Sequence, residues 1–482
     1  MRLESVRCDV AVVGGGAAGL WTALAAAELG VKVALISRTP LSESASFRAQ
    51  GGLAAALEPG DSPEQHAADT IAAGRGLCRP SAVQVLTEAA PAAVEELLRR
   101  GVRFDTDGGE LELGLEGGHT RRRVVHARGS ETGREITGRL ADLAAESPRV
   151  EALERTSALG LWSDGDCNFG VLTDRGAIQA GSTILATGGA AALWRRTTNP
   201  WGAIGAGPVM AGAAGADLAD LELCQFHPTA LALAGSRWDA ALITEAVRGE
   251  GAALLDAAGQ RFTDELAPRD AVAAAVLARM QAESSDHVGL DLREVEPDRF
   301  PSVFAMLREA GLEPSREPVP VAPAAHYMMG GIATDLDGRT SLAGLLAVGE
   351  CACTGLHGAN RLASNSLSEC FVFGSRAAAA ASDAVVQAEK APDPSGPRFE
   401  PPALHTRDAV WELAGPLRDA DGLRRLAEDP YPLARGIAAM ALERAESRGA
   451  HRRADAPGLD PGLDGVHLVQ NRHRPIRHEK WV

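Results

Sequence analysis

Aromatic residues and paired cysteines are both scarce in this chain of 482 residues. Phe, Trp and Tyr make up 4% of the sequence, whereas hydrophobic residues as a whole make up 45%. This composition favours an Ala/Gly-rich α/β protein with a large core. The seven cysteines are dispersed, without a CxxC pair and without zinc or iron–sulfur spacing. Dispersed thiols are typical of a reducing compartment, so we expect a cytoplasmic protein without a metal site.

Positive charge is also under-represented. Lys and Arg number 48 against 64 Asp and Glu, which gives a net charge of −16, and the basic residues are scattered. Nucleic-acid binding needs a positive footprint, so we expect no nucleic-acid partner. An acidic small-molecule substrate remains compatible, because a few arginines set the field inside a cleft.

A long apolar run is the third absence. Residues 10–36 are mostly apolar, but glycines and then Glu28 and Lys32 interrupt them. The first ten residues carry charges of both signs, unlike the apolar centre of a signal peptide. We therefore expect a βαβ unit here and no membrane association.

A glycine motif lies inside this βαβ unit. Gly14-x-Gly16-x-x-Gly19 follows the expected strand 10–13 and opens an expected helix, residues 19–29, that leads to a second strand, residues 31–36. In that context glycines, which lack a side chain, allow backbone N–H groups and a helix N-terminus to bind a pyrophosphate. An ordinary tight turn is the alternative. The acid expected after the second strand is replaced by Ser37 and Arg38, so plain NAD selectivity is unsupported.

A second strand-to-glycine junction lies far along the chain. The apolar run 345–348 is followed by Gly349 and Glu350, and then by residues 358–367, which include Arg361. Two such junctions suggest a dinucleotide held at both ends, with Arg361 presented to an anionic substrate beside it.

The remaining pattern indicates several domains. We expect a first nucleotide-binding part at 1–227, an inserted capping domain at 228–325, and a second nucleotide-binding part at 326–391. Residues 392–402 read as a proline-rich linker, and 403–482 as a C-terminal helical region with an irregular tail from residue 455. A helix is expected at 270–283, and an Ala-rich one from Glu369 to about Gln387.

Three side chains near the expected cap have ordinary alternative interpretations. Arg269 begins a helix and could be a surface or capping arginine. His227 and His326 lie among apolar residues, where a histidine is more often a core donor than a catalyst. Both nevertheless bracket the cap in sequence, and domain seams are favoured places for ligand sites.

Several motifs taken in order resemble the flavoprotein family of fumarate reductases, succinate dehydrogenases and L-aspartate oxidases. The resemblance runs from the first strand to the C-terminal helices and implies bound FAD. It also implies an α/β fold: a Rossmann-like FAD-binding domain with an inserted α+β capping domain and a short C-terminal helical domain. The motifs are residues 49–52, 225–229, 244–251, 267–270, 326–331 and 361–367.

Two sequence features indicate which branch of the family this chain resembles. Ala45 stands where respiratory members carry the histidine that links the flavin covalently, which implies non-covalent FAD. The loop around Glu116 resembles the L-aspartate oxidase branch, in which a glutamate approaches the substrate's amino group. This branch implies oxidation of L-aspartate to iminoaspartate, with oxygen or fumarate as acceptor, and delivery to quinolinate synthase in NAD biosynthesis. The alternatives are a soluble fumarate reductase or succinate-oxidising flavoprotein and a flavin-binding scaffold without catalysis.

The resemblance also implies roles by position. Arg269 matches the arginine that shuttles a proton, Glu245 and Arg248 its relay, and Glu116 the group that takes the α-ammonium. Four residues match the clamp on the substrate's carboxylates: His227, Thr244, His326 and Arg361. The positions that match FAD contacts are Gly14, Gly15, Gly16, Ala17, Ala18, Gly19, Ser37, Arg38, Ser44, Ala45, Ser46, Phe47, Arg48, Ala49, Gln50, Gly51, Glu350, Ser366 and Leu367.

One position departs from the family pattern. Ala206 stands where the family has an aspartate, between two glycines, that contacts the flavin. Losing a charge-assisted hydrogen bond costs about 1.5–3 kcal/mol, or roughly ten- to a hundredfold in affinity. We therefore expect weaker FAD retention than in the family at large.

Overall fold

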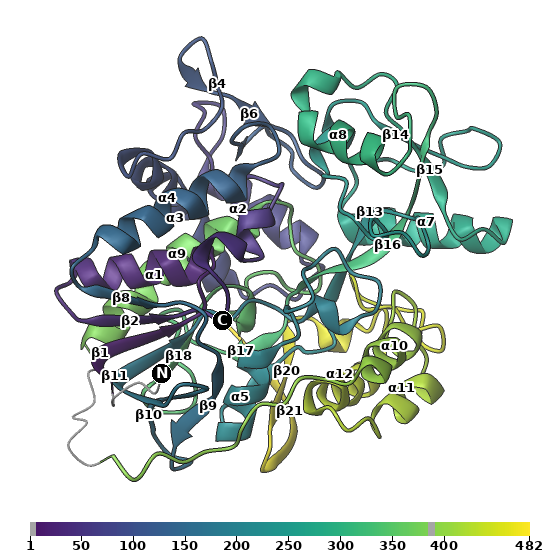
Figure 1. Ribbon diagram of the computed structural model, residues 1–482. Coiled ribbons are helices and arrows are strands. Elements are labelled where there is room, and N and C mark those ends of the chain that lie inside the picture. Colours follow the sequence, from purple (N-terminus) through teal and green to yellow (C-terminus); the bar gives the residue numbers. More distant parts are fainter. Residues whose placement is uncertain (1–5, 384–390) are drawn as a thin grey trace.

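The computed structural model describes residues 6–383 and 391–482, and its largest sheet, at the lower left of Figure 1, has seven strands. Strand β11 lies in the middle, parallel to β1 and to β18, and β1 in turn is parallel to β2 and β2 to β8. Strands β10 and β9 continue the sheet as an antiparallel edge. The strands are β1 Val6–Val13, β2 Val33–Ile36, β8 Val150–Leu153, β9 Ala158–Ser163, β10 Asn168–Thr173, β11 Ala177–Leu185 and β18 Leu345–Ala347.

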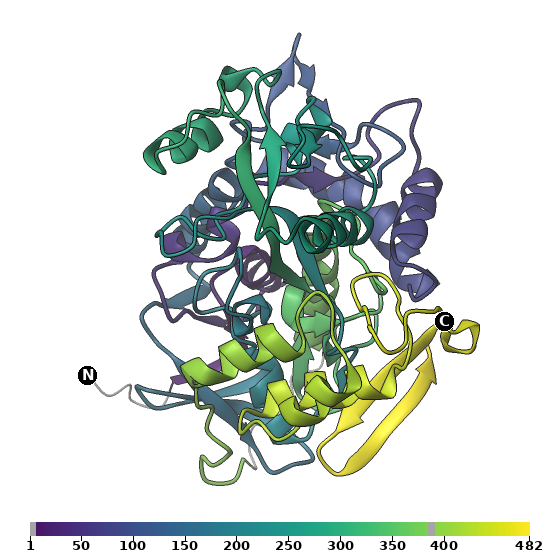
Figure 2. The same ribbon diagram turned by 90° about the vertical axis from the view of Figure 1, so that its right-hand side faces the viewer.

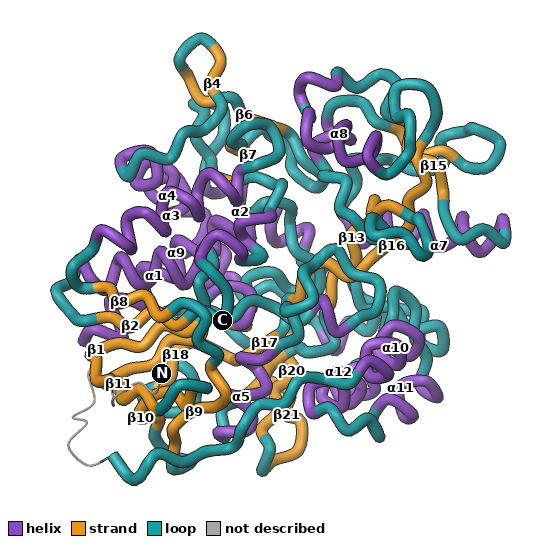
Figure 3. The backbone as a smooth tube through the Cα atoms, in the orientation of Figure 1, coloured by secondary structure: helices purple, strands orange, loops and turns teal. Residues whose placement is uncertain are grey.

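Helices cover one face of this sheet, above it in Figure 1 and in purple in Figure 3. Successive side chains of a strand point to opposite faces, so Val10 and Val12 pack against these helices. Ala11 and Val13 pack on the other face, where helix α5, Ala206–Ala214, lies. The covering helices are α1 Ala17–Glu28, α2 Pro63–Ala73, α3 Pro80–Arg99, α4 Thr132–Glu146 and α9 Asn365–Asp383.

The segment predicted as a cap is a separate α+β layer, at the upper right of Figure 1. Its antiparallel sheet has the order β13-β16-β15-β14 and encloses an aliphatic core of its own. We propose 228 and 325 as the cap's limits, both of which fall inside its two longest strands. The elements are β13 Cys224–Leu231, α6 Ala246–Gly249, β14 Ala253–Leu255, α7 Arg269–Glu283, β15 Val288–Asp291, α8 Pro301–Glu309 and β16 Val319–Met328.

The C-terminal region begins with the predicted helices, α10 Leu404–Leu413, α11 Ala420–Leu426 and α12 Pro432–Glu443. The prediction of an irregular tail is wrong, because β20, Val466–Asn471, and β21, Arg474–Lys480, form a hairpin (yellow in Figure 2). Strand β20 pairs with residues near 218, a partner that local sequence cannot reveal. The hairpin completes a five-stranded sheet with β12 Leu218–Ala219, β17 Gly331–Ala333 and β19 Ala352–Cys353.

The remaining elements named here are short. Helix α9 begins at Asn365, four residues before the predicted start at Glu369; its predicted end near Gln387 lies outside the described residues. In the described parts of the chain, no helix combines the length and apolar composition needed to cross a bilayer. The small elements are β3 Leu53–Ala54, β4 Thr106–Asp107, β5 Glu110–Leu111, β6 Leu113–Gly114, β7 Val124–Val125 and the 3₁₀ turns Leu41–Glu43, Ser46–Arg48 and Gly349–Cys351.

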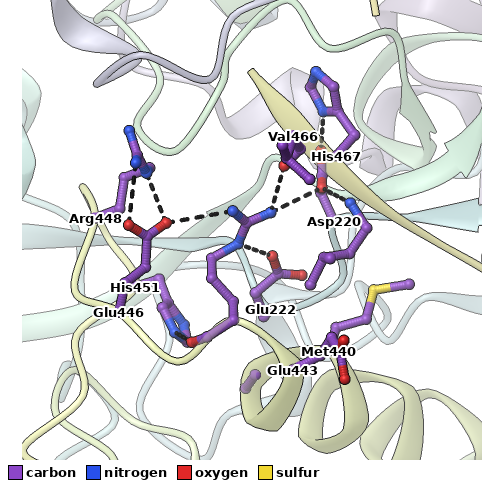
Figure 4. Close-up of polar contacts among 12 residues, drawn as sticks. Asp220, Glu222, Met440, Glu443, Glu446, Arg448, His451, Val466 and His467 are labelled. Atoms are coloured by element: carbon purple, nitrogen blue, oxygen red, sulfur yellow. Dashed lines mark hydrogen bonds and ion pairs between the residues drawn. The ribbon is translucent and has the colours of Figure 1, made fainter. Parts of the chain in front are cut away.

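A buried charge network joins the C-terminal region to the rest of the molecule (Figure 4). Arg444, just after α12, donates from Nε to Glu222 Oε1 at 2.6 Å and from Nη2 to the carbonyl of Val466 at 3.0 Å. Asp220 bonds His467 of β20 at 2.5 Å. Because these side chains are fully buried, the C-terminal elements are part of the same packed structure.

Candidate active site

The glycine junction after β1 has the geometry of a nucleotide-binding turn. Gly14 has φ +127°, and a Cβ there would lie 2.1 Å from the carbonyl oxygen of Ala186. A Cβ at Gly19 would lie 1.8 Å from the carbonyl oxygen of Gly14. Only glycine therefore allows α1 to start this close to the sheet edge, where its first N–H groups form an anion site.

The segment predicted to run along the cofactor crosses this helix end. The hydroxyl of Ser46 accepts a hydrogen bond from the backbone N–H of Ala17 at 3.1 Å. Gly51 lies beside Ser364, since a Cβ there would be 3.6 Å from Ser364 Oγ. The buried Oε1 of Gln50 has no hydrogen-bond partner among the described residues. The segment therefore carries a buried acceptor that is available to a bound cofactor.

Other predicted cofactor residues lie along the same edge. After β18, Glu350 accepts a hydrogen bond from the backbone of Met328 at 2.9 Å, and its burial raises the pKa of the carboxyl to about 7. Arg38 reaches the carbonyl of Gly202 at 3.4 Å. Ser37 donates to the carbonyl of Thr39 at 2.7 Å. Glycines, a helix N-terminus, hydroxyls and one carboxylate together fit the pyrophosphate and sugar of a dinucleotide, and Ala45 offers no group for a covalent bond.

Arg269 is the centre of a charged cluster under the cap. It is the first residue of α7, it is 7% exposed, and its Nε donates to Glu245 Oε2. Glu245 also pairs with Arg248 at 3.2 Å and accepts from the backbone of Gly117 at 2.9 Å. Burial, followed by the charge of Arg269, lowers the pKa of Arg248. The structure thus brings together the three residues of the predicted proton relay.

Two β-bulges bring the two histidines into an edge-to-face ring contact. The pairing of β13 with β16 shifts register at His326, and again between His227 and Ala230. Bulges re-aim side chains and are frequent beside active sites. The ring centroids of His227 and His326 lie 5.0 Å apart. Burial and then the nearby Arg269 lower both pKa values well below 6.5, so both rings are neutral donors.

Arg361 lies in the turn before α9 and is 3% exposed. Its Nη1 donates to Ser366 Oγ at 3.1 Å, and its buried Nε has no hydrogen-bond partner in the described parts of the chain. Burial and then Arg269 lower its pKa to about 10, so the guanidinium is still charged at neutral pH. Leu367 is buried at the start of the same helix.

Glu116 lies in the loop between β6 and β7, at the same cluster. Its carboxylate contacts His126 Nε2 at 3.2 Å and accepts a hydrogen bond from Ser364 Oγ at 2.6 Å. Burial alone would raise its pKa, but His126, Ser364 and Arg269 hold it at about 2. A buried, ionised carboxylate therefore lies beside the arginines. Thr244 is also buried, and its hydroxyl faces the backbone of Ala246 at 3.5 Å.

Three partners of these residues were not predicted. Gln225 accepts from Arg269 Nη1 at 3.2 Å and donates to the carbonyl of Arg361 at 2.7 Å, so it links the two arginines. Gln225 belongs to the motif 225–229, and membership of that motif was the sequence signal that could have identified it as a site residue. Ser364 also stood inside a motif, 361–367, and His126 lies 10 residues after Glu116, but no local pattern marks the contacts of either with Glu116.

This nucleotide-binding turn, with a buried arginine and histidine cluster under an α+β cap, defines the class of FAD-dependent oxidoreductases. Residues 9–367 match the family model described as FAD binding domain, so FAD is the cofactor. An L-aspartate oxidase from Nostoc sp. is 47% identical over 420 residues, covering 83% of this chain and 70% of the relative. One from Mesorhizobium japonicum is 45% identical, covering 93% and 92%. The chain belongs to the L-aspartate oxidase family.

Solved structures agree with this placement. The quinol fumarate reductase FrdA of E. coli superposes with a TM-score of 0.89 at 28% identity, over 99% of this chain and 97% of the other. Sdh1 of Mycobacterium smegmatis superposes with a TM-score of 0.82 at 29% identity, over 99% and 94%. The predicted architecture, an FAD-binding domain with an inserted cap, is confirmed.

Proposed function

We propose that this protein oxidises L-aspartate to iminoaspartate, passing electrons to oxygen or to fumarate, as the first step of NAD biosynthesis. The observation that carries the proposal is Glu116: a buried carboxylate, held ionised beside a cluster of arginines, fits the α-ammonium of an amino acid. A dicarboxylate without an amine would have no use for it. We place the reaction in the cytoplasm, consistent with seven unpaired cysteines, and quinolinate synthase as the user of the product.

Substrate binding follows from the charges. Arg361 supplies free N–H donors to one carboxylate, and the neutral rings of His227 and His326 donate hydrogen bonds without adding charge. Thr244 contributes a hydroxyl beside them. Such a clamp orients the substrate's Cα hydrogen, and orientation is a large part of catalysis in a site of this kind. Glu116 then holds the nitrogen, which distinguishes aspartate from succinate.

Bound FAD would supply an acceptor for the Cα hydrogen and its electron pair. The residues that would hold FAD are Gly14–Gly19, Ser44–Gly51, Glu350, Ser366 and Leu367. Formation of the imine also removes one proton from the ammonium group. Arg269 is the group placed to move that proton, through its Nε contact with Glu245 and on to Arg248. The electron pair and two hydrogens then balance as hydrogen peroxide from oxygen, or as succinate from fumarate.

The test is anaerobic bleaching of the flavin near 450 nm after loading with FAD, with L-aspartate and succinate in separate cuvettes. Bleaching by aspartate alone would support the amino-acid oxidase. Bleaching by succinate alone would show that the proposal is wrong. No bleaching with FAD bound would point to a scaffold.

A soluble fumarate reductase or succinate-oxidising flavoprotein is the second candidate. The TM-score of 0.89 with the FrdA chain favours it, since every clamp residue suits a plain dicarboxylate. The loop of Glu116 separates the two candidates, because only an amine needs that charge.

A further inference from the structure

Arg361 differs from the other buried arginines of the site in having no carboxylate partner among the residues that the structure describes. Arg269 pairs with Glu245, and Arg248 does the same. Arg361 makes one side-chain hydrogen bond, to the neutral hydroxyl of Ser366. A buried charge is costly unless something compensates it, so another group must hold this guanidinium in place.

That group is the ring of Tyr327. The guanidinium carbon of Arg361 lies 4.6 Å from the ring centroid, within the range of a cation–π contact. Such a contact places no acceptor atom against the guanidinium, so no anionic partner occupies its N–H groups. A carboxylate in the same place would occupy those N–H groups and compete with an anionic substrate.

Tyr327 is itself held in place by two buried neighbours. Its hydroxyl donates to Glu369 Oε2 at 2.8 Å, and His357 Nε2 contacts the same oxygen at 2.9 Å. The rings of Tyr327 and His357 meet edge to face, with centroids 5.3 Å apart and planes at 89°. All three side chains are buried. In the β13–β16 ladder Tyr327 pairs with Gln225, which bonds the carbonyl of Arg361.

We infer that Tyr327 is a positioning residue that orients Arg361 toward the substrate's carboxylate without using its donors. His357 acts one step further back, by packing edge to face against the ring. The inference rests on the proposed function, in which Arg361 binds a carboxylate of the substrate. It adds a neutral aromatic support to a clamp otherwise made of hydrogen-bond donors.

The test compares Tyr327→Leu with Tyr327→Phe in the FAD-loaded protein. The measurements are the dissociation constant of succinate, from perturbation of the flavin spectrum, and KM and kcat for L-aspartate. Loss of the ring is expected to raise the succinate constant and KM about 3- to 30-fold, with kcat changed less than about threefold. Phe keeps the ring and is expected to stay within about threefold of the wild type.

Tyr431, the other of the chain's two tyrosines, supplies the matched control. It is buried before α12, and its hydroxyl donates to the carbonyl of Ile204 at 2.8 Å. Tyr431→Leu is expected to lower the melting temperature and leave succinate affinity unchanged. Where Tyr327→Leu fails to fold, Tyr327→Met fills a similar volume and carries the same test.

Arg361→Gln separates failure of the inference from failure of the function. If this variant weakens succinate binding at least a hundredfold while Tyr327→Leu binds as the wild type does, the inference about Tyr327 is overturned and the clamp stands. If Arg361→Gln binds succinate normally, the clamp itself is wrong. Equal weakening by Tyr327→Leu and Tyr327→Phe would also overturn the inference, because the ring would not be the cause.

Discussion

Ser364 donates a 2.6 Å hydrogen bond to Glu116 across 248 residues of sequence, from a left-handed backbone with φ 61°. Such a conformation is unfavourable for serine and persists where the surroundings impose it, often at active sites. The bond ties the proposed amine-binding carboxylate to the loop that carries Arg361, three residues earlier. The ammonium group and one carboxylate of an amino dicarboxylate would thus be bound by two loops that are tied together.

Replacement of Glu116 is therefore expected to separate substrates. Glu116→Gln should lower kcat/KM for L-aspartate about 10- to 100-fold, the loss of a charge-assisted hydrogen bond. Fumarate reduction should change less than about threefold. Glu112→Gln, in the same region but half-exposed, is the control. Parallel losses with both substrates would remove the amine-binding role.

Replacement of Arg269 is expected to stop proton movement while leaving binding measurable. Arg269→Gln should lower turnover about 10²- to 10⁴-fold, the usual contribution of a general acid or base. Spectral titration with succinate should still detect binding, because Arg361 and the histidines are unchanged. Arg279→Gln, on the same helix α7 and partly exposed, is the control. Turnover within tenfold of the wild type would exclude Arg269 as the shuttle.

Retention of FAD tests the effect of Ala206. This residue is the first of α5, after Gly205 with φ +74°. Ala206→Asp is expected to tighten FAD binding about 10- to 100-fold, if the added carboxylate makes the family's contact. Ala213→Asp, near the other end of α5, should not. Full FAD occupancy of the unmodified protein after dialysis would contradict the predicted weakness.

The pKa of Glu350 predicts a pH dependence of FAD affinity. Burial raises it to about 7, from an ordinary value of 4.5, so the folded protein favours the protonated form. The contribution of protonated Glu350 to the stability of the folded protein is fully present below pH 4.5 and is lost as pH rises through 7. An ionised carboxylate accepts a hydrogen bond from a hydroxyl more strongly than a neutral carboxyl does, so FAD affinity should rise as pH approaches 7 and then level off. Glu350→Gln should flatten the profile, measured by flavin fluorescence; a flat wild-type profile would refute the assignment.

The C-terminal charge network is expected to be important for stability. Arg444→Met leaves the buried Glu222 without its cation, which should lower the free energy of unfolding by about 3–5 kcal/mol. Arg424→Met removes an exposed pair with Asp421 and should cost less than about 1 kcal/mol. Denaturant titration checks both. Similar small losses would mean that the network is neutral.

Much of the fold could be predicted because its signals are local. The β1–α1 turn needs glycine at positions 14 and 19 for steric reasons that the motif itself displays. The start of α7 at Arg269 follows from Pro268 and the helical pattern after it. The hairpin 466–480 was missed because its outer strand is charged and its partner, β12, lies about 250 residues earlier.

The sequence by itself determined the glycine turns, the reduced thiols and the order of the motifs, since each depends on a few neighbouring residues. Only the tertiary structure decided how those motifs act together. It placed His227 opposite His326 through two bulges, joined Glu116 to Ser364, and laid Arg361 on Tyr327. The reason is physical: the pKa values and free donors of this site arise from burial and from contacts between distant segments, which no local pattern contains.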